Sequence, residues 1–195
     1  MDDFNTRFLA ESKAHAKLLL DANVLIYAQE AFRATNLHLL EFLDQLSGRV
    51  DWYVASCVAL KLHNGGSYDV TSLDKHVLNC DDIGMKMDSL PFIKENGDLG
   101  FVKLNALAGD DWAQICLAHN NPELIIATND SAMFRSAHAS LEGRAIAFHD
   151  LLDKLSPYWT VEPAWLRLKT WLIENKQPLR NNGSWIIDGQ RSQSG

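Results

Sequence analysis

The sequence predicts an α/β domain of three layers, α/β/α, with helices on both faces of a central, mostly parallel β-sheet. Short apolar runs of strand length alternate along the chain with longer stretches whose apolar residues recur at helical spacing. Some of these short runs are continuously apolar, which is typical of strands buried on both faces of a parallel sheet. The repeated alternation of strand and helix favours a doubly wound sheet.

The first half of the chain contains two expected strands, each followed by helical sequence. The run AKLLL predicts a buried strand, and DWYVAS predicts another because it is rich in aromatic and β-branched residues. Gly65 and Gly66 end the last helix of this half, since glycine favours the backbone of a helix C-cap. In chain order we expect a strand at 16–20, helices at 23–32 and 37–46, a strand at 51–56 and a helix at 57–64.

Residues 67–108 have no clear periodicity, and we expect two short helices and a loop there, as an irregular insertion or lid. The main domain is placed at residues 1–156, with an N-terminal arm at 1–16. Residues 157–195 are expected to form a C-terminal helix and a disordered tail. The remaining expected elements are helices at 110–120, 131–141 and 161–176 and strands at 123–128 and 144–148.

Composition limits the class of protein. With 195 residues, 47% hydrophobic and 22% charged, the chain suits a single domain with a sizeable core. Its three cysteines are scattered and form no CxxC motif, which argues against a disulfide framework or a zinc knot. No apolar run approaches the roughly 20 residues of a membrane span, and the N-terminus lacks a signal-peptide pattern. We therefore expect a cytoplasmic protein with no membrane partner.

The net charge of −7 and the pI of about 5.4 argue against a general nucleic-acid binder, which usually carries a basic surface. They do not exclude a nuclease, because bound cations offset the charge of an acidic metal site. Contacts to phosphate would then come from a local basic patch.

Three acidic signals stand where one metal site would need them. Asp21 and Asp130 each follow an expected strand directly, and Asp110 and Asp111 begin an expected helix. The carboxyl ends of parallel strands face the ligand crevice of an open sheet, and carboxylates there bind Mg²⁺ or Mn²⁺. Such cations assist phosphodiester hydrolysis. The alternative is that each aspartate caps or begins a helix, and for Asp21 taken alone capping is the preferred interpretation.

The motifs LLLDANVLIYA, GDDW and IIATND, in this order, resemble those of the PIN-domain family of metal-dependent nucleases over about residues 16–152. The resemblance implies a PIN-like fold and a Mg²⁺- or Mn²⁺-dependent endoribonuclease. Its metal ligands would be Asp21, Asp110 and Asp130. Helical phase does not separate Asp110 from Asp111, so both are candidate catalytic residues, with Asp110 preferred as the ligand. The positions that would orient a ligand, a metal-bound water or the scissile phosphate are Asn23, Thr128 and Asn129.

One residue departs from the family pattern. The family usually has a glutamate in a V-x-x-E-L motif on the helix after the second strand, but here VALKL places Lys61 at that position. A protonated lysine cannot ligate a cation, although it can pair with an aspartate or contact a phosphate. Three aspartates still suffice for one cation, whereas a second cation would lose a ligand. The alternative function is therefore a catalytically weak or inactive PIN-like module that serves as a protein- or RNA-binding scaffold.

The resemblance also implies partners. It suggests RNA as substrate, a toxin-type or RNA-processing role, and an antitoxin or other protein partner or a homodimer. A phosphatase-type hydrolase is the less favoured third interpretation, because Asn23 stands where the second aspartate of its DxD start would be.

Overall fold

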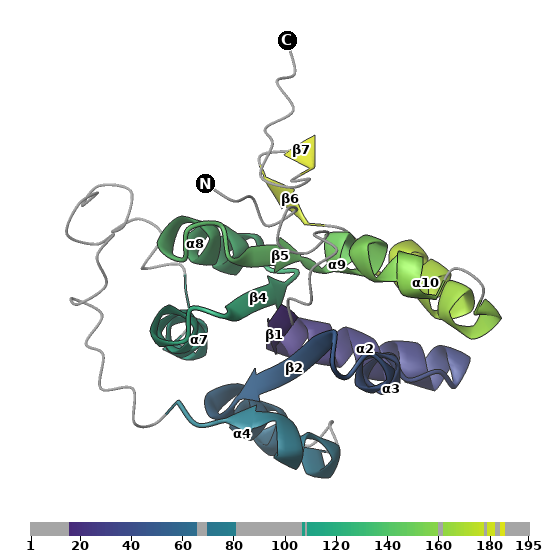
Figure 1. The fold of residues 1–195 in the computed structure, drawn as a ribbon, viewed down its shortest axis with the longest axis horizontal. Helices are drawn as coiled ribbons and strands as arrows, with labels where there is room; N and C mark the ends of the chain where they lie inside the picture. The colour runs from purple at the N-terminus through teal and green to yellow at the C-terminus, as the bar shows by residue number, and fades with distance from the viewer. Residues whose placement is uncertain are drawn as a thin grey trace.

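The structure is a computed structural model (Figure 1). The predictions for the N-terminal arm, for most of the insertion and for the end of the tail fall outside the residues that it describes. The residues that the structure describes are 16–65, 70–80, 107, 109–159, 162–177, 179–181 and 184–185.

A five-stranded sheet forms the centre of the domain, with strand order β3-β2-β1-β4-β5 and parallel pairing throughout. This confirms the predicted α/β class and the predicted parallel sheet, and it makes β1 the central strand. The strands are β1 (Ala16–Leu20), β2 (Val50–Ala55), β3 (Val77–Leu78), β4 (Leu124–Thr128) and β5 (Ala145–Ala147).

Helices cover both faces of the sheet. In Figure 1, α2, α3, α9 and α10 lie on one side, and α7 and α8 lie on the other, so the domain has three layers. Short 3-10 turns and a two-stranded ribbon complete the described elements. The helices are α2 (Ala22–Thr35), α3 (Leu39–Gln45), α4 (Ser56–Asn64), α7 (Gly109–Asn120), α8 (Ser131–Ser140), α9 (Phe148–Leu155) and α10 (Pro163–Asn175), with turns η1 (Val70–His76) and η3 (Ser156–Tyr158) and ribbon strands β6 (Arg180–Asn181) and β7 (Ser184–Trp185).

Two elements differ from the sequence prediction. The described part of the expected insertion contains the turn η1 and the edge strand β3, which pairs with β2, instead of helix and loop alone. The last predicted strand ends at Ala147, and Phe148 begins the unpredicted helix α9. Phe148 is fully buried, with its ring 5.8 Å from that of Tyr27. Phe148, Leu151, Leu152 and Leu155 are buried and recur at helical spacing, a local signal that the prediction missed.

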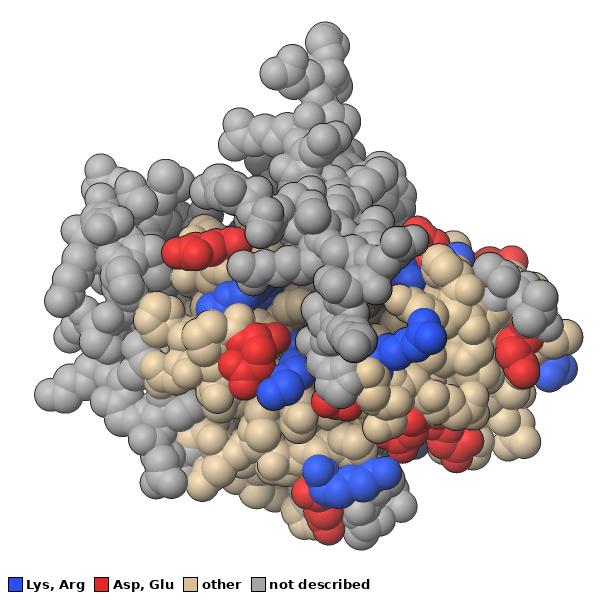
Figure 2. Space-filling model, viewed as in Figure 1, with Lys and Arg blue, Asp and Glu red and all other residues tan. Residues whose placement is uncertain are grey.

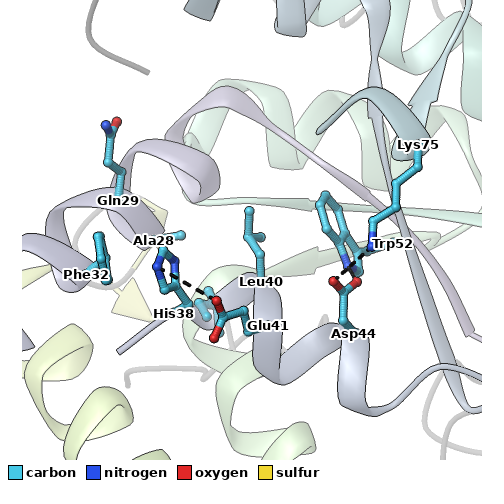
Figure 3. A pocket seen from close by; sticks show the side chains of 10 residues that line it. Ala28, Gln29, Phe32, His38, Leu40, Glu41, Asp44, Trp52 and Lys75 are labelled. Atoms are coloured by element: carbon cyan, nitrogen blue, oxygen red, sulfur yellow. Dashed lines mark hydrogen bonds and ion pairs between the residues drawn. The ribbon is translucent and has the colours of Figure 1, made fainter. Parts of the chain in front are cut away.

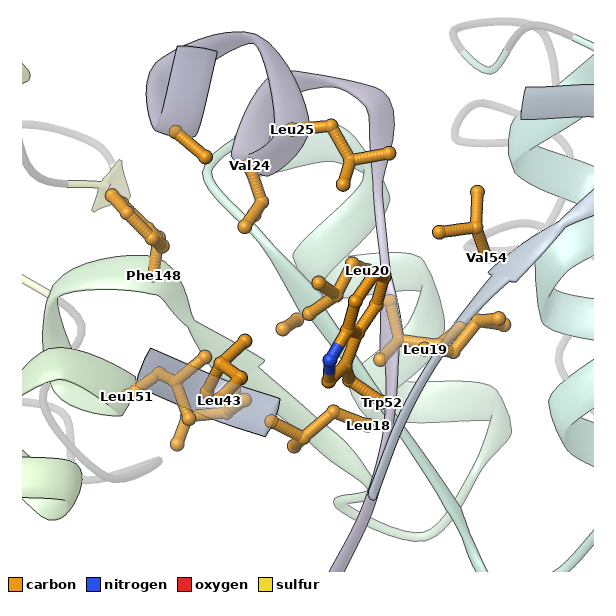
Figure 4. Close-up of a cluster of buried hydrophobic side chains, with 14 of the residues drawn as sticks. Leu18, Leu19, Leu20, Val24, Leu25, Leu43, Trp52, Val54, Phe148 and Leu151 are labelled. Atoms are coloured by element: carbon orange, nitrogen blue, oxygen red, sulfur yellow. The ribbon is translucent and has the colours of Figure 1, made fainter. Parts of the chain in front are cut away.

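The core fixes the position of β1. Leu18, Leu19 and Leu20 are fully buried, and each such leucine stabilises the fold by roughly 2 kcal/mol. Figure 4 shows Leu18 near Leu43 of α3 and Leu151 of α9. The residue that follows β1 is therefore attached to a fully buried part of the central strand.

The C-terminal helix α10 packs along α2, and its tryptophan stripe contributes to the core. Trp165, Leu168 and Leu172 are fully buried, and the Trp165 ring lies 5.6 Å from that of Phe42. The apolar face of α10 therefore belongs to the hydrophobic core. In the part of the chain that the structure describes, no helix is long and apolar enough to cross a membrane.

Candidate metal site

Asp21 lies at the point in the sheet where the order of the strands reverses. From β1 the chain adds β2 and β3 on one side, and β4 and β5 on the other, so the reversal lies between β1 and β4. Open α/β sheets bind ligands at this point, outside the carboxyl ends of the strands. Leu20 pairs with Ala127, so Asp21 and Thr128 come next, side by side. Asp21 and Thr128, which the sequence predicts as site residues, therefore lie at the expected ligand-binding position.

The Asp21 carboxylate is buried and accepts four hydrogen bonds. Its Oδ1 accepts from the backbone N–H of Ala22 at 2.6 Å and from Nε2 of Gln114 at 3.2 Å. Its Oδ2 accepts from Oγ1 of Thr128 at 2.6 Å and from Nδ2 of Asn23 at 2.7 Å. A carboxylate offers about four acceptor sites, so all of them are occupied. The bond from Ala22 also confirms that Asp21 caps α2.

Burial raises the pKa of Asp21 above its ordinary value of 3.8, because it removes water from the charged form. The hydrogen bonds from Thr128 and Gln114 act in the opposite direction, and the negative charge of Asp130 adds a smaller increase. The ionised carboxylate is therefore less well stabilised here than in water, and a nearby cation would offset that deficit.

Asp130 is exposed and caps α8. Its Oδ1 accepts from the backbone N–H groups of Ala132 and Met133, both at 2.8 Å, which confirms the capping interpretation. Its own N–H donates to Oγ1 of Thr128 at 3.0 Å. Thr128 thus bonds both to the side chain of Asp21 and to the backbone of Asp130, and it fixes the two aspartates relative to each other.

Asp110 and Asp111 lie in the first turn of α7, and Lys61 of α4 reaches the first of them. The Nζ atom of Lys61 donates to Oδ2 of Asp110 at 2.6 Å, so the lysine pairs with an aspartate, as one of the sequence interpretations proposed. The hydrogen bond to Asp110 raises the pKa of Lys61, and the charges of Asp110, Asp111 and Asp21 add to it, while burial opposes them. Lys61 therefore stays protonated on the aspartate that was preferred as a ligand.

The structure brings some predicted residues into contact and leaves others apart. Asp21, Asn23 and Thr128 form one hydrogen-bonded network, which Asn129 joins by donating its N–H to Oδ1 of Asn23 at 2.9 Å. The Lys61–Asp110 pair is separate from this network in hydrogen bonding, although the charges interact. Among the residues described, no three aspartate, glutamate, histidine or cysteine side chains group closely enough to hold a metal ion as they stand. Cation binding would therefore require side-chain movement, with Lys61 leaving its aspartate.

Sequence reasoning missed Gln114, which lies fully buried on α7 and donates to Asp21. Within the described part of the chain, its Oε1 and the Oδ1 of Asn129 are buried without a hydrogen-bond partner. Leaving such an oxygen without a donor costs about 1–3 kcal/mol, and a bound ion or water would relieve it. Carboxylate and amide oxygens are also the ligands that Mg²⁺ and Mn²⁺ prefer. The available signal was a glutamine four residues after Asp110, inside an apolar helix.

A polar pocket of about 510 Å³ adjoins Asp130. Its lining includes Tyr27, Asn129 and Lys176. Lys176 forms an ion pair with Glu30, and its Nζ lies 4.7 Å from the centroid of the Tyr27 ring. Lys176 follows α10, far from the acidic motifs in sequence, so only the fold reveals that it lies near them.

A second pocket, of about 460 Å³, lies between α2 and α3 and has mixed apolar and acidic lining (Figure 3). Asp44 accepts from Nε1 of Trp52 at 2.9 Å and pairs with Lys75 at 3.3 Å. The ring of His76 stacks on that of Trp52, with centroids 3.6 Å apart. The sequence gave no indication of this pocket.

On the face shown in Figure 2, acidic and basic side chains of the described residues are interspersed. Comparisons with known proteins found no matching protein-family model, no significantly similar curated protein and no significantly similar solved structure. The likeness to PIN nucleases therefore stands on the aspartate motifs of the sequence alone.

Proposed function

We propose that the chain is a metal-dependent ribonuclease whose active site lies at the carboxyl ends of β1 and β4. The supporting observation is Asp21, a carboxylate only 4% exposed at the reversal of the strand order, beside the amide of Gln114, whose oxygen lacks a donor. Burying a charge in this way is unfavourable unless a counter-charge compensates it. A divalent cation is the counter-charge that this set of oxygen atoms would bind.

Asp21, Asp110 and Asp130 would hold Mg²⁺ or Mn²⁺, which when bound supplies Lewis acidity and an activated water for phosphodiester hydrolysis. The protein's own contribution is to fix these side chains. Thr128 holds the Asp21 side chain and the Asp130 backbone, at 2.6 Å and 3.0 Å respectively. Asn23 donates to Oδ2 of Asp21 at 2.7 Å, which keeps the carboxylate in one orientation.

The pocket beside Asp130 is the proposed location of the RNA strand. The ring of Tyr27 offers a surface for a base, and Lys176 offers a positive charge for a phosphate. Lys61 is the other lysine near the acids, and it can contact a phosphate once it leaves Asp110. RNA is preferred over DNA because of the family resemblance.

The test is cleavage of a fluorescent single-stranded RNA with Mg²⁺ or Mn²⁺, with excess EDTA, and with an Asp21→Asn variant purified in parallel. We expect cleavage that requires the cation, stops in EDTA and falls at least about 100-fold in the variant. Cleavage that continues in EDTA, or at equal rate in the variant, would reject the proposed site.

The Lys61–Asp110 ion pair favours a second candidate, an inactive scaffold that binds RNA or protein, because the lysine occupies a ligand oxygen. Calorimetric titration with Mn²⁺ separates the two. A nuclease site binds Mn²⁺ in the wild type and loses it in Asp21→Asn. Absence of binding in the wild type, together with RNA binding by fluorescence anisotropy, would support the scaffold.

A further inference from the structure

Gln114 has a fully buried side chain whose amide nitrogen is hydrogen-bonded and whose amide oxygen is not. Its Nε2 donates to Oδ1 of Asp21 at 3.2 Å, the longest of the four hydrogen bonds to that carboxylate. Its Oε1 has no partner among the described residues, although it is completely covered. The side-chain amide therefore lies against the candidate metal site with one half used and the other half unsatisfied.

We propose that Gln114 is a neutral oxygen ligand of the divalent cation, and that its amide turns over when the cation binds, so that Oε1 takes the place of Nε2. This inference depends on the proposed metal-dependent function and adds a ligand to it. In the metal-free protein the Nε2–H group supplies partial positive charge to Asp21. When a bound cation supplies that charge, the Gln114 atom beside Asp21 must be an oxygen that can ligate the cation, instead of an N–H donor.

The turn-over suits a buried side chain. The two ends of the amide have nearly the same shape, so exchanging them requires no repacking of α7. The exchange gives Oε1 the cation as a partner and moves the Nε2–H donors to the position that Oε1 leaves. Lys61 stands where the family has a glutamate, so an additional oxygen from Gln114 would restore the number of ligands without adding negative charge.

The experiment compares Mn²⁺ affinity by calorimetry in the wild type, Gln114→Met, Gln114→Glu and Asp21→Asn. Methionine keeps the length of the side chain but has neither the amide oxygen nor the N–H donor, whereas glutamate keeps the oxygens and loses the donor. We expect about 10-fold weaker binding for Gln114→Met and equal or tighter binding for Gln114→Glu. Ser136→Ala is the matched control, because it removes another buried polar atom without a described partner, and it should leave the affinity unchanged.

The outcomes separate this inference from the proposed function. If the wild type binds no Mn²⁺, both are overturned. If the wild type binds and Asp21→Asn does not, but Gln114→Met binds normally, only the role of Gln114 is overturned. If Gln114→Met and Gln114→Glu are both weaker, Gln114 acts only as a donor that orients Asp21, and the ligand role is again rejected.

A measurement on the wild type avoids any effect of substitution on folding. The side-chain NH₂ signal of Gln114, followed by nuclear magnetic resonance, should shift on addition of Mg²⁺ because the N–H leaves its carboxylate acceptor. The same signal in Asp21→Asn should not respond to Mg²⁺. An unchanged signal in wild-type protein that binds Mg²⁺ would overturn the turn-over.

Discussion

Two acidic regions of the molecule have similar composition but different surroundings. One is the candidate metal site, formed by Asp21, Asp110, Asp130 and Lys61. The other, here called the Trp52 pocket, is formed by Asp44, Glu41, Lys75 and His76 around Trp52. Both pair an aspartate with a lysine, at 2.6 Å and 3.3 Å, and both adjoin a pocket.

The difference lies in which buried atoms lack a partner. In the Trp52 pocket, Nε2 of His76 has no hydrogen-bond partner among the described residues but lies 3.4 Å from Oδ1 of Asp44, and a histidine nitrogen can take up a proton. In the candidate metal site the atom without a hydrogen-bond partner is the amide oxygen of Gln114, which only accepts. Acidity alone therefore does not mark a cation site. The feature that distinguishes the candidate metal site is a buried acceptor without a donor.

The largest effect should come from the buried aspartate. Asp21→Asn removes the charge at the centre of the site, and we expect Mn²⁺ binding to fall at least about 100-fold, below detection by calorimetry. Asp44→Asn is the matched control, since it removes an equal charge but keeps an oxygen to accept from Trp52, and it should leave Mn²⁺ affinity unchanged. Equal losses in the two variants would mean that only net charge matters, and the distinction between the regions would fail.

Charge reversal at Lys61 should have the next largest effect. Lys61→Glu removes the ion pair with Asp110 and adds a carboxylate, so Mn²⁺ should bind about 10-fold more tightly, and RNA cleavage should increase with it. Lys61→Ala should act in the same direction but less, because it adds no ligand. Lys75→Glu makes the same change beside Asp44 and should not affect Mn²⁺. If Mn²⁺ affinity is indifferent to both Lys61 substitutions, Lys61 lies outside the site.

The central part of the fold was predictable because its signals are local. The strands β1 and β4 are continuous apolar runs that end at Asp21 and Thr128, and the helices after them show clear periodicity. The strand β3 was not predictable, because a two-residue edge strand depends on its pairing with β2. The helix α9 was missed, although Phe148, Leu151, Leu152 and Leu155 recur at helical spacing.

The candidate site divides in the same way. The capping roles of Asp21 and Asp130 follow from their neighbours in sequence, and the Lys61–Asp110 pair was anticipated by placing VALKL on a family motif. Gln114 and Lys176 were missed, because their contacts join residues distant in the chain. The contact between Gln114 and Asp21 depends on how α7 packs beside β1, and no spacing rule supplies that.

A smaller effect should separate capping from cation binding at Asp130. Asparagine caps helices nearly as well as aspartate. Asp130→Asn, at the N-cap of α8, should therefore change the free energy of unfolding of the domain by less than about 0.5 kcal/mol. Asp130→Ala should cost about 1 kcal/mol, because the bonds to Ala132 and Met133 are lost. Chemical denaturation measures both, and Mn²⁺ affinity should fall in both. Normal affinity in Asp130→Asn would leave Asp130 with the capping role alone.

The smallest effect concerns the proton at the Trp52 pocket. His76 donates its Nδ1–H to the carbonyl of Trp52 at 2.9 Å, and burial lowers the pKa of His76 below its ordinary value of 6.5, against the charges of Asp44 and Asp51. The unfolded chain therefore binds this proton at a higher pH than the folded protein. The stability that the neutral ring contributes is complete above pH 6.5 and is lost as the pH falls through the folded-state pKa. The free energy of unfolding of the wild type minus that of His76→Phe, which keeps a ring on Trp52, should therefore decrease from pH 7 towards pH 5. Mn²⁺ should leave this decrease unchanged. A difference that increases on acidification, or disappears with Mn²⁺, would contradict the assignment of a proton to the Trp52 pocket and of a cation to the candidate metal site.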